Sequence, residues 1–542
     1  MQARARSAWI ARAAIGLAIG LVAASAALAA KPPRVHALVG ARIVVAPGKV
    51  IESGTVVLRD GLIAAVGAGV QAPPDARIWD AKGLTIYPGL IEPYSARPWP
   101  APKEPDKAPQ DGLPNAALHS ERDMTLYAAD EGAAKKLREA GFTTALVAPK
   151  DGILRGRSVV LELGDGNVAD NLLREGFAQH ASIHPVARRR EGGGYPESLM
   201  GAVALFRQTM LDAGWYGKAQ AAYARNPAQE RPPVEPGLEA LAGVAAGKDL
   251  IVFETEDVLD TLRVAELVRE FKLHAAVVGN GEEYKRLEDV KRTGLPHILP
   301  LAFPKPPKID GAGDPTTDLE DLRYWDAAPD NPHRLLATGL EVAFTSYRLD
   351  EPKKLYDSLA KAIGRGLTAD QALAALTTTP ARLLGLSSRL GTIEVGKIAD
   401  LAVVEGDLFV DKPKIREVWV DGKRYEIKES KPAEVSAAGT WQLTVKTGDG
   451  QEIPVTIEIS GKTGALSGTV AAMDKTVPLA SAEVSGNKLE VSFDGTAFGE
   501  AGTIEMSLEI SGDNAHGAGT SPGGGFTVSG SRTGKPNLEV AS

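Results

Sequence analysis

The chain has 542 residues, of which 44% are hydrophobic and 24% are charged, and its formal net charge is −8. This length exceeds what one hydrophobic core accommodates, so we expect two or three domains. No run of basic residues is long enough to follow a phosphate backbone, which argues against nucleic acid as a partner, and the absence of cysteine excludes disulfides and thiolate metal sites.

The first 29 residues have the pattern of a signal peptide. Arg4, Arg6 and Arg12 precede an apolar run of small residues at 13–27, and Ala27-Leu28-Ala29 is an A-x-A cleavage signal. The run is short for a bilayer span, and no later stretch is long enough to form one. We therefore expect a signal peptide at 1–29, an exported protein that is periplasmic or secreted, and no membrane span.

Two β-rich segments flank the middle of the chain. Asp60-Gly61 lies between two apolar runs, which is a strong hairpin signal, and Asp421-Gly422 repeats it far downstream. Neither segment has enough strands to bury a core alone. We expect residues 33–85 and 391–430 to form one composite β-sandwich domain.

The middle of the chain, residues 86–390, alternates helical and strand patterns. "EGAAKKLREAGFTTALVAP" is an amphipathic helix followed by a glycine and a β run, and two later stretches repeat this form. The alternation predicts an α/β fold, a (β/α)8 TIM-like barrel. A doubly wound open sheet is the rival, but no GxGxxG follows a strand. The Pro/Gly-rich stretches 99–112 and 302–315 are expected loops over the active face.

From about residue 436 the composition changes to short runs of alternating polar and apolar residues. Runs such as "TWQLTVKT" and "TIEMSLEI" are separated by turn sequences such as "GDG" and "SGDN". This pattern predicts a C-terminal all-β domain at 436–533, built as an antiparallel sandwich or small barrel.

Three motifs together resemble the amidohydrolase superfamily, in particular its imidazolonepropionase-like branch. They are "PGLIEPY" from residue 88, the barrel pattern, and the tail "GTIEVGKIADLAVVEGDLF" at 391–409. The resemblance implies hydrolysis of non-peptide carbon–nitrogen bonds, assisted by zinc or another divalent metal. It also implies metal ligands at the carboxyl ends of the strands: His-x-His after the first, further histidines, and an Asp after the eighth.

The residues at those positions are not the family's ligands. The two histidine positions that follow Glu92 hold Tyr94 and Ala96, the strand-eight Asp position holds Ser346, and Gly279 stands where a histidine is common. We therefore expect no bound metal and no other cofactor, and the resemblance identifies no catalytic residue.

Several side chains are nevertheless expected at the barrel mouth, as candidate catalytic or ligand-binding groups: Glu92, Tyr94, Glu254, His297, Ser346 and Arg348. The acidic run that begins at Glu254 also suits the start of a helix, and His297 also suits a core position. His180 and His184 have metal-pair spacing on a helix, but Pro185 follows at once and no Glu lies between them, which favours a structural role.

Three functions stay open. The first is an exported amidohydrolase-family hydrolase of carbon–nitrogen bonds whose metal site is lost or remodelled. The second is a metal-free pseudo-enzyme that binds a small molecule or associates with an active paralogue. The third is a carbohydrate- or surface-binding protein in which the C-terminal β domain carries recognition.

Overall fold

The computed structural model describes residues 35–95, 113, 115, 117–126, 131–184, 195–307, 318–410, 412–427, 433–447, 450–462, 465–499, 502–521 and 524–534. The predicted signal peptide, Ala96 and the Pro-rich stretch 99–112 lie outside the described residues, as does most of the second Pro/Gly-rich stretch from residue 308 onward. The chain divides into two compact units at the Ile427/Lys428 boundary. Within the described part, no helix is both long and apolar enough to cross a membrane.

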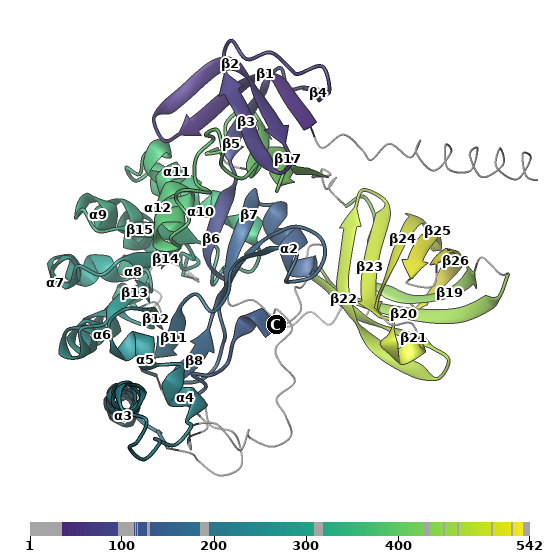
Figure 1. Cartoon of the computed structure of the whole chain (residues 1–542). Coiled ribbons are helices and arrows are strands. Elements are labelled where there is room, and N and C mark those ends of the chain that lie inside the picture. The colour runs from purple at the N-terminus through teal and green to yellow at the C-terminus, as the bar shows by residue number, and fades with distance from the viewer. Residues whose placement is uncertain are drawn as a thin grey trace, which may run out of the picture. The chain divides into compact units, whose positions relative to one another are not determined.

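One sheet of the first unit is built from both ends of that unit (Figure 1). Its strand order is β18-β17-β16-β5-β1-β2-β3, with β4 paired to β1. Its strands are β1 Val35–Ala46, β2 Lys49–Arg59, β3 Leu62–Gly67, β4 Arg77–Asp80, β5 Leu84–Pro88, β16 Leu401–Glu405, β17 Lys414–Val420 and β18 Lys423–Glu426. The antiparallel pairing of β5 with β16 joins the two segments, as the composite domain requires.

Both predicted Asp-Gly hairpins are present in this sheet. Asp60 and Gly61 have φ values of 49° and 81° between β2 and β3, and Asp421 and Gly422 have 48° and 72° between β17 and β18. Positive φ at both central residues is the requirement of a type I′ turn, which Asp-Gly meets at little cost.

The barrel strands run parallel around the centre of the first unit. They are β6 Leu90–Ser95, β7 Phe142–Val147, β11 Gln179–Ser182, β12 Leu250–Glu254, β13 His274–Val278, β14 His297–Pro300 and β15 Val342–Thr345. β6 pairs with β7, and β11 to β15 pair in sequence order, all in parallel. The predicted TIM-like barrel is confirmed.

A short antiparallel segment fills the interval between β7 and β11. β8, Leu154–Arg157, pairs with β11, whereas β9, Val159–Glu162, pairs with β7 and with β10, Leu172–Arg174. This one stretch therefore borders both parallel groups of strands, and it places β8 beside β11.

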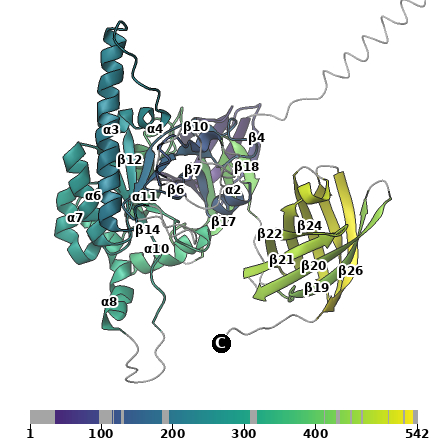
Figure 2. The same cartoon turned by 90° about the horizontal axis from the view of Figure 1, so that it is seen from below.

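Helices cover the outside of the barrel, and Figure 2 shows α3, α6 and α7 outside β12 and β14. The helices are α2 Glu131–Arg138, α3 Leu199–Arg225, α4 Pro236–Glu239, α5 Ala242–Ala245, α6 Val258–Phe271, α7 Leu287–Thr293, α8 Leu319–Ala327, α9 Asn331–Ala337, α10 Leu355–Ile363, α11 Ala369–Leu376 and α12 Thr378–Leu383, with 3₁₀ turns η1 Met124–Leu126, η2 Glu283–Arg286, η3 Ala328–Asp330 and η4 Pro352–Lys354. Thr368 caps α11 in a capping box with Gln371.

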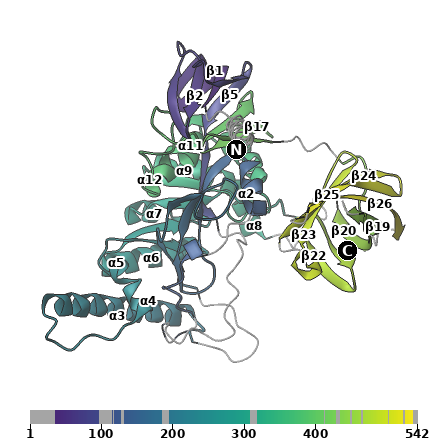
Figure 3. The ribbon, with the colours of Figure 1, turned by 45° about the vertical axis from the view of Figure 1, so that its right-hand side comes forward.

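The second unit is a closed antiparallel barrel (Figure 3). Its strands are β19 Gly439–Thr447, β20 Glu452–Lys462, β21 Ala465–Ala472, β22 Lys475–Ser485, β23 Lys488–Asp494, β24 Thr503–Ser511, β25 Asn514–Ser521 and β26 Gly524–Gly534, with η5 Thr496–Phe498 before β24. Pairing of β19 with β26 closes the ring, so the barrel alternative is confirmed over the sandwich. Trp441 fills part of its core, with Nε1 donating to the Ala437 carbonyl at 2.8 Å.

Candidate functional site

The carboxylate of Glu92 lies fully buried and accepts four hydrogen bonds at the end of β15. Oε1 accepts from the Thr345 hydroxyl and, at 3.4 Å, from the Tyr94 backbone N–H. Oε2 accepts from the Ser346 hydroxyl at 2.6 Å and from the Ser346 backbone N–H at 2.9 Å. Because β6 and β15 belong to separate hydrogen-bonded sheets, this carboxylate links the first and last barrel strands. Burial raises the pKa of Glu92, and the hydrogen bonds from Ser346 and Thr345 oppose that rise.

A second polar network lies beside the first and centres on Glu254, the last residue of β12. Arg155 of β8 forms an ion pair with Oε2, and the Tyr94 hydroxyl donates to the same oxygen at 3.3 Å. The Tyr347 hydroxyl donates to Oε1 at 2.6 Å, and Arg348 Nη2 lies 3.4 Å from that oxygen. The side chains of Arg155 and Glu254 are only 13% and 14% exposed, so this ion pair is largely desolvated. The hydrogen bonds from Tyr94 and Tyr347 satisfy further acceptor positions of the carboxylate.

The charges of this network shift the pKa values of its members. Burial alone would raise the pKa of Glu254, but the charge and the hydrogen bond of Arg155 outweigh it and lower that pKa to about 2. Burial and then the Glu254 charge raise the pKa of Tyr347 to about 12 and raise the pKa of Tyr94 further. At neutral pH the carboxylate of Glu254 is therefore charged and both phenols are neutral.

Arg348 is held in place by its backbone as well as by its side chain. Its φ of 68° lies in the left-handed region, which is uncommon for a residue other than glycine. Nη2 donates to the Thr255 carbonyl at 2.9 Å, so the guanidinium bridges the segments that follow β12 and β15.

Five of the six predicted mouth residues come together in these two networks: Glu92, Tyr94, Glu254, Ser346 and Arg348. His297 does not join them. It opens β14 opposite Val342, the first residue of β15, and therefore lies at the amino ends of the strands. Its Nδ1 donates to the Leu295 carbonyl at 2.8 Å, and burial lowers its pKa, so it is a core histidine.

The two spaced histidines are not on a helix. His180 is a fully buried residue of β11 whose ring lies 5.6 Å from that of Tyr94, and neither ring nitrogen has a hydrogen-bond partner among the described residues. Burial, then the Arg155 charge, lowers the pKa of His180 to about 3. His184 follows the strand and instead pairs with Asp260 at the start of α6.

Comparisons with known proteins agree with the barrel fold. A profile of the amidohydrolase family matches residues 336–425. A dihydroorotase of Anaeromyxobacter dehalogenans is 26% identical over 409 residues, covering 68% of this chain and 87% of its own. An imidazolonepropionase of Symbiobacterium thermophilum is 25% identical over 379 residues, covering 66% and 84%. The crystal structure of an amidohydrolase from Thermotoga maritima superposes with a TM-score of 0.61 at 19% identity, covering 72% of this chain and 99% of that one.

Residues 336–425 of this chain match the amidohydrolase family. The chain's imidazolonepropionase-like resemblance is supported by the sequence relatives, and its fold by the solved structure.

The side chains at the barrel mouth do not fit the divalent metal that the family resemblance implies. The phenol of Tyr94 is neutral and is already hydrogen-bonded to Glu254 and Arg155. Both oxygens of Glu92 are engaged as well: Oε1 accepts from Thr345 and Tyr94, and Oε2 accepts from Ser346. Across the residues that the structure describes, no three His, Asp or Glu side chains gather as a metal site would require. At the end of β13, Gly279 leaves room for the carboxylate of Glu283, which caps the Asn280 backbone N–H at 2.9 Å.

Two members of the Glu254 network, Arg155 and Tyr347, were not predicted. Arg155 lies in "GILRGRSVV", a stretch with no helical or long strand periodicity, and its partner lies 99 residues further along the chain. Tyr347 follows Ser346 directly, and its position after the last barrel strand was the available signal.

Proposed function

We propose that this is an exported, metal-independent binding protein built on the amidohydrolase fold, which holds a small polar molecule at the carboxyl ends of its barrel strands. One observation carries the proposal: Glu254, Arg155 and Tyr94 satisfy one another at the place where the family resemblance puts the metal. An arginine in salt-bridge contact with the only carboxylate of that network opposes a divalent cation by charge repulsion.

Glu254 and Arg155 lie on barrel strands rather than on loops, and each retains a small solvent-exposed fraction. Rigidly placed, partly exposed polar groups at this end of a TIM barrel are suited to orient a ligand. A partner protein, such as an active relative of the same family, is the second ligand class that we propose for this face.

Metal content tests the central claim. We expect well under one equivalent of zinc, manganese or iron in the purified mature protein, and no drop in melting temperature on adding a chelator, because no metal-binding free energy is coupled to folding. A stoichiometric metal that chelation removes, with a lower melting temperature, would refute the proposal.

Hydrolysis of a non-peptide carbon–nitrogen bond is the second candidate function, and the dihydroorotase and imidazolonepropionase relatives favour it. Assays on small cyclic amides, with and without added zinc or manganese, distinguish a hydrolase from a binding protein. Turnover that is lost in the Glu254→Gln and Arg155→Met variants would establish the hydrolase.

Export is tested by sequencing the amino terminus of the protein recovered outside the cytoplasm. We expect the mature chain to begin after Ala29 or Ala30. A mature protein that keeps Met1 would contradict this.

A further inference from the structure

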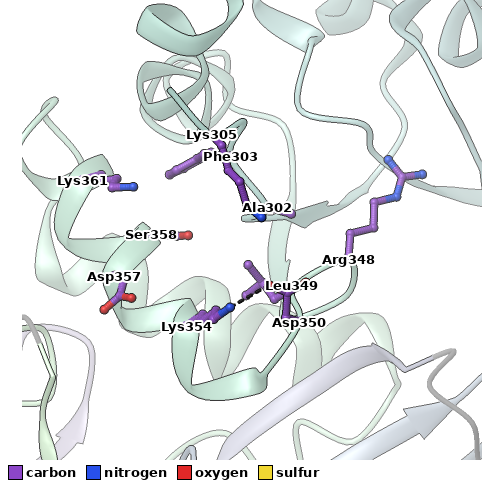
Figure 4. Close-up of a pocket in the computed structure, with 10 residues that line it drawn as sticks. All are labelled: Ala302, Phe303, Lys305, Arg348, Leu349, Asp350, Lys354, Asp357, Ser358 and Lys361. Atoms are coloured by element: carbon purple, nitrogen blue, oxygen red, sulfur yellow. Dashed lines mark hydrogen bonds and ion pairs between the residues drawn. The ribbon is translucent and has the colours of Figure 1, made fainter. Parts of the chain in front are cut away.

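A cavity of about 200 Å³ lies between the segments that follow the last two barrel strands and one face of α10 (Figure 4). Its lining differs from the Glu254 network except for Arg348, whose guanidinium points away from the centre of the cavity. The lining residues are Ala302, Phe303, Lys305, Arg348, Leu349, Asp350, Lys354, Asp357, Ser358 and Lys361.

Four of these residues come from one face of a helix. Lys354 directly precedes α10, and Asp357, Ser358 and Lys361 follow it at spacings of three, four and seven residues, which places all four on the same side. Figure 4 shows Ser358 Oγ and Lys361 Nζ directed into the open space, with Lys305 on the facing wall.

The cationic side chains of the cavity are not all neutralised. Lys354 pairs with Asp350 at 2.6 Å, and Arg348 is engaged by Glu254 and Thr255. Lys305 and Lys361 form no ion pair or hydrogen bond with any residue that the structure describes. Two lysines that face one cavity repel each other, and a bound dianion would remove that repulsion.

We propose that this cavity binds a phosphate group, either free or as a phosphate monoester. Lys305 and Lys361 supply the two charges from opposite walls, and the Ser358 hydroxyl donates a hydrogen bond. Lysine acts at phosphate as a point charge that needs no fixed approach angle, which suits two long side chains on separate segments. The loops after the seventh and eighth strands of TIM barrels form phosphate sites in many enzymes.

Phosphate binding in this cavity does not depend on whether the barrel binds metal or hydrolyses an amide. The probes are inorganic phosphate and methyl phosphate, titrated calorimetrically into the full mature chain. We expect saturable binding that weakens at least tenfold in the Lys305→Gln/Lys361→Gln double variant. The control is Lys218→Gln/Lys248→Gln, which removes the same charge from exposed positions on and near α3 and α5, and it should bind as the wild type does.

A second variant adds a test in the opposite direction. Asp357→Asn removes the one lining carboxylate that has no ion-pair partner among the described residues, so phosphate should bind more tightly. Absence of saturable binding, equal weakening in the control pair, or tighter binding of succinate than of phosphate would overturn the proposal. Melting temperatures near that of the wild type show that each variant is folded.

Discussion

The Ser346 hydroxyl donates a 2.6 Å hydrogen bond to the carboxylate of Glu92, from a position 254 residues further along the chain. Family resemblance assigns an acid–base Asp to the position of Ser346 and a metal between these two strands. The buried carboxylate and the donors around it connect β6 to the end of β15 by hydrogen bonds.

Glu92→Gln should destabilise the first unit by roughly 1–3 kcal/mol. In glutamine, an NH₂ group replaces one of the two carboxylate oxygens and faces a hydroxyl and a backbone N–H. The hydroxyl can rotate to accept from it, but the backbone N–H of Tyr94 or Ser346 can only donate and therefore loses its acceptor. Denaturant unfolding measures the loss. The control, Glu52→Gln, changes a carboxylate that is 83% exposed. Its free energy of unfolding should lie within about 0.5 kcal/mol of that of the wild type. Equal stabilities of the two variants would contradict the role of Glu92.

Glu254 should contribute stability at neutral pH that is lost in acid. Its folded-state pKa of about 2 lies below its ordinary value of 4.5, so the contribution is complete above pH 4.5 and disappears as pH falls toward 2. Between pH 4.5 and pH 2, the wild type should lose up to roughly 3 kcal/mol more free energy of unfolding than Glu254→Gln loses. Glu266→Gln, which breaks an exposed ion pair with Arg269, is the matched control. If the free energy of unfolding falls equally steeply with pH in the wild type and in Glu254→Gln, Glu254 is not a charged, paired carboxylate.

Restoring the family ligands should create metal binding together with a new repulsion. Tyr94→His, Ala96→His and Ser346→Asp together supply two imidazoles and a carboxylate, but Asp at 346 would meet the carboxylate of Glu92. We expect the triple variant to melt below the wild type without metal and to gain melting temperature on adding zinc. Tyr94→His/Ala96→His, which keeps Ser346, separates the two effects. Zinc stabilisation of the wild type would show that the native residues already hold a metal.

The C-terminal barrel should fold without the rest of the chain, because its eight strands close on one another and enclose their own core. Residues 433–534 expressed alone should show a cooperative thermal transition, and Trp441→Ala should lower its stability by about 3–5 kcal/mol. If this fragment also binds an oligosaccharide that the full chain binds, recognition belongs to this barrel. An unfolded fragment would contradict its independence.

The fold was predictable where local chemistry decides the backbone. Asp60-Gly61 sets a hairpin through its φ values, and Thr368 begins a helix through a side-chain cap, and both signals lie within a few residues. The places of Glu92, Tyr94, Glu254 and Ser346 at the barrel mouth followed from their positions at or after the ends of barrel strands. The individual contacts among them, and the participation of Arg155, did not, since these side chains meet only in the folded barrel and no sequence period records which of them touch.

The pairing of β5 with β16 has a consequence for biosynthesis. Leu401 of β16 lies opposite Pro88 of β5, so more than 300 residues must be made before this ladder can form. Loop closure over such a distance is slow, and until then one side of β5 presents unpaired N–H and C=O groups. Until β16 has been made, this edge of β5 is open to pairing with another chain, and a chain truncated before residue 401 would retain the unpaired edge.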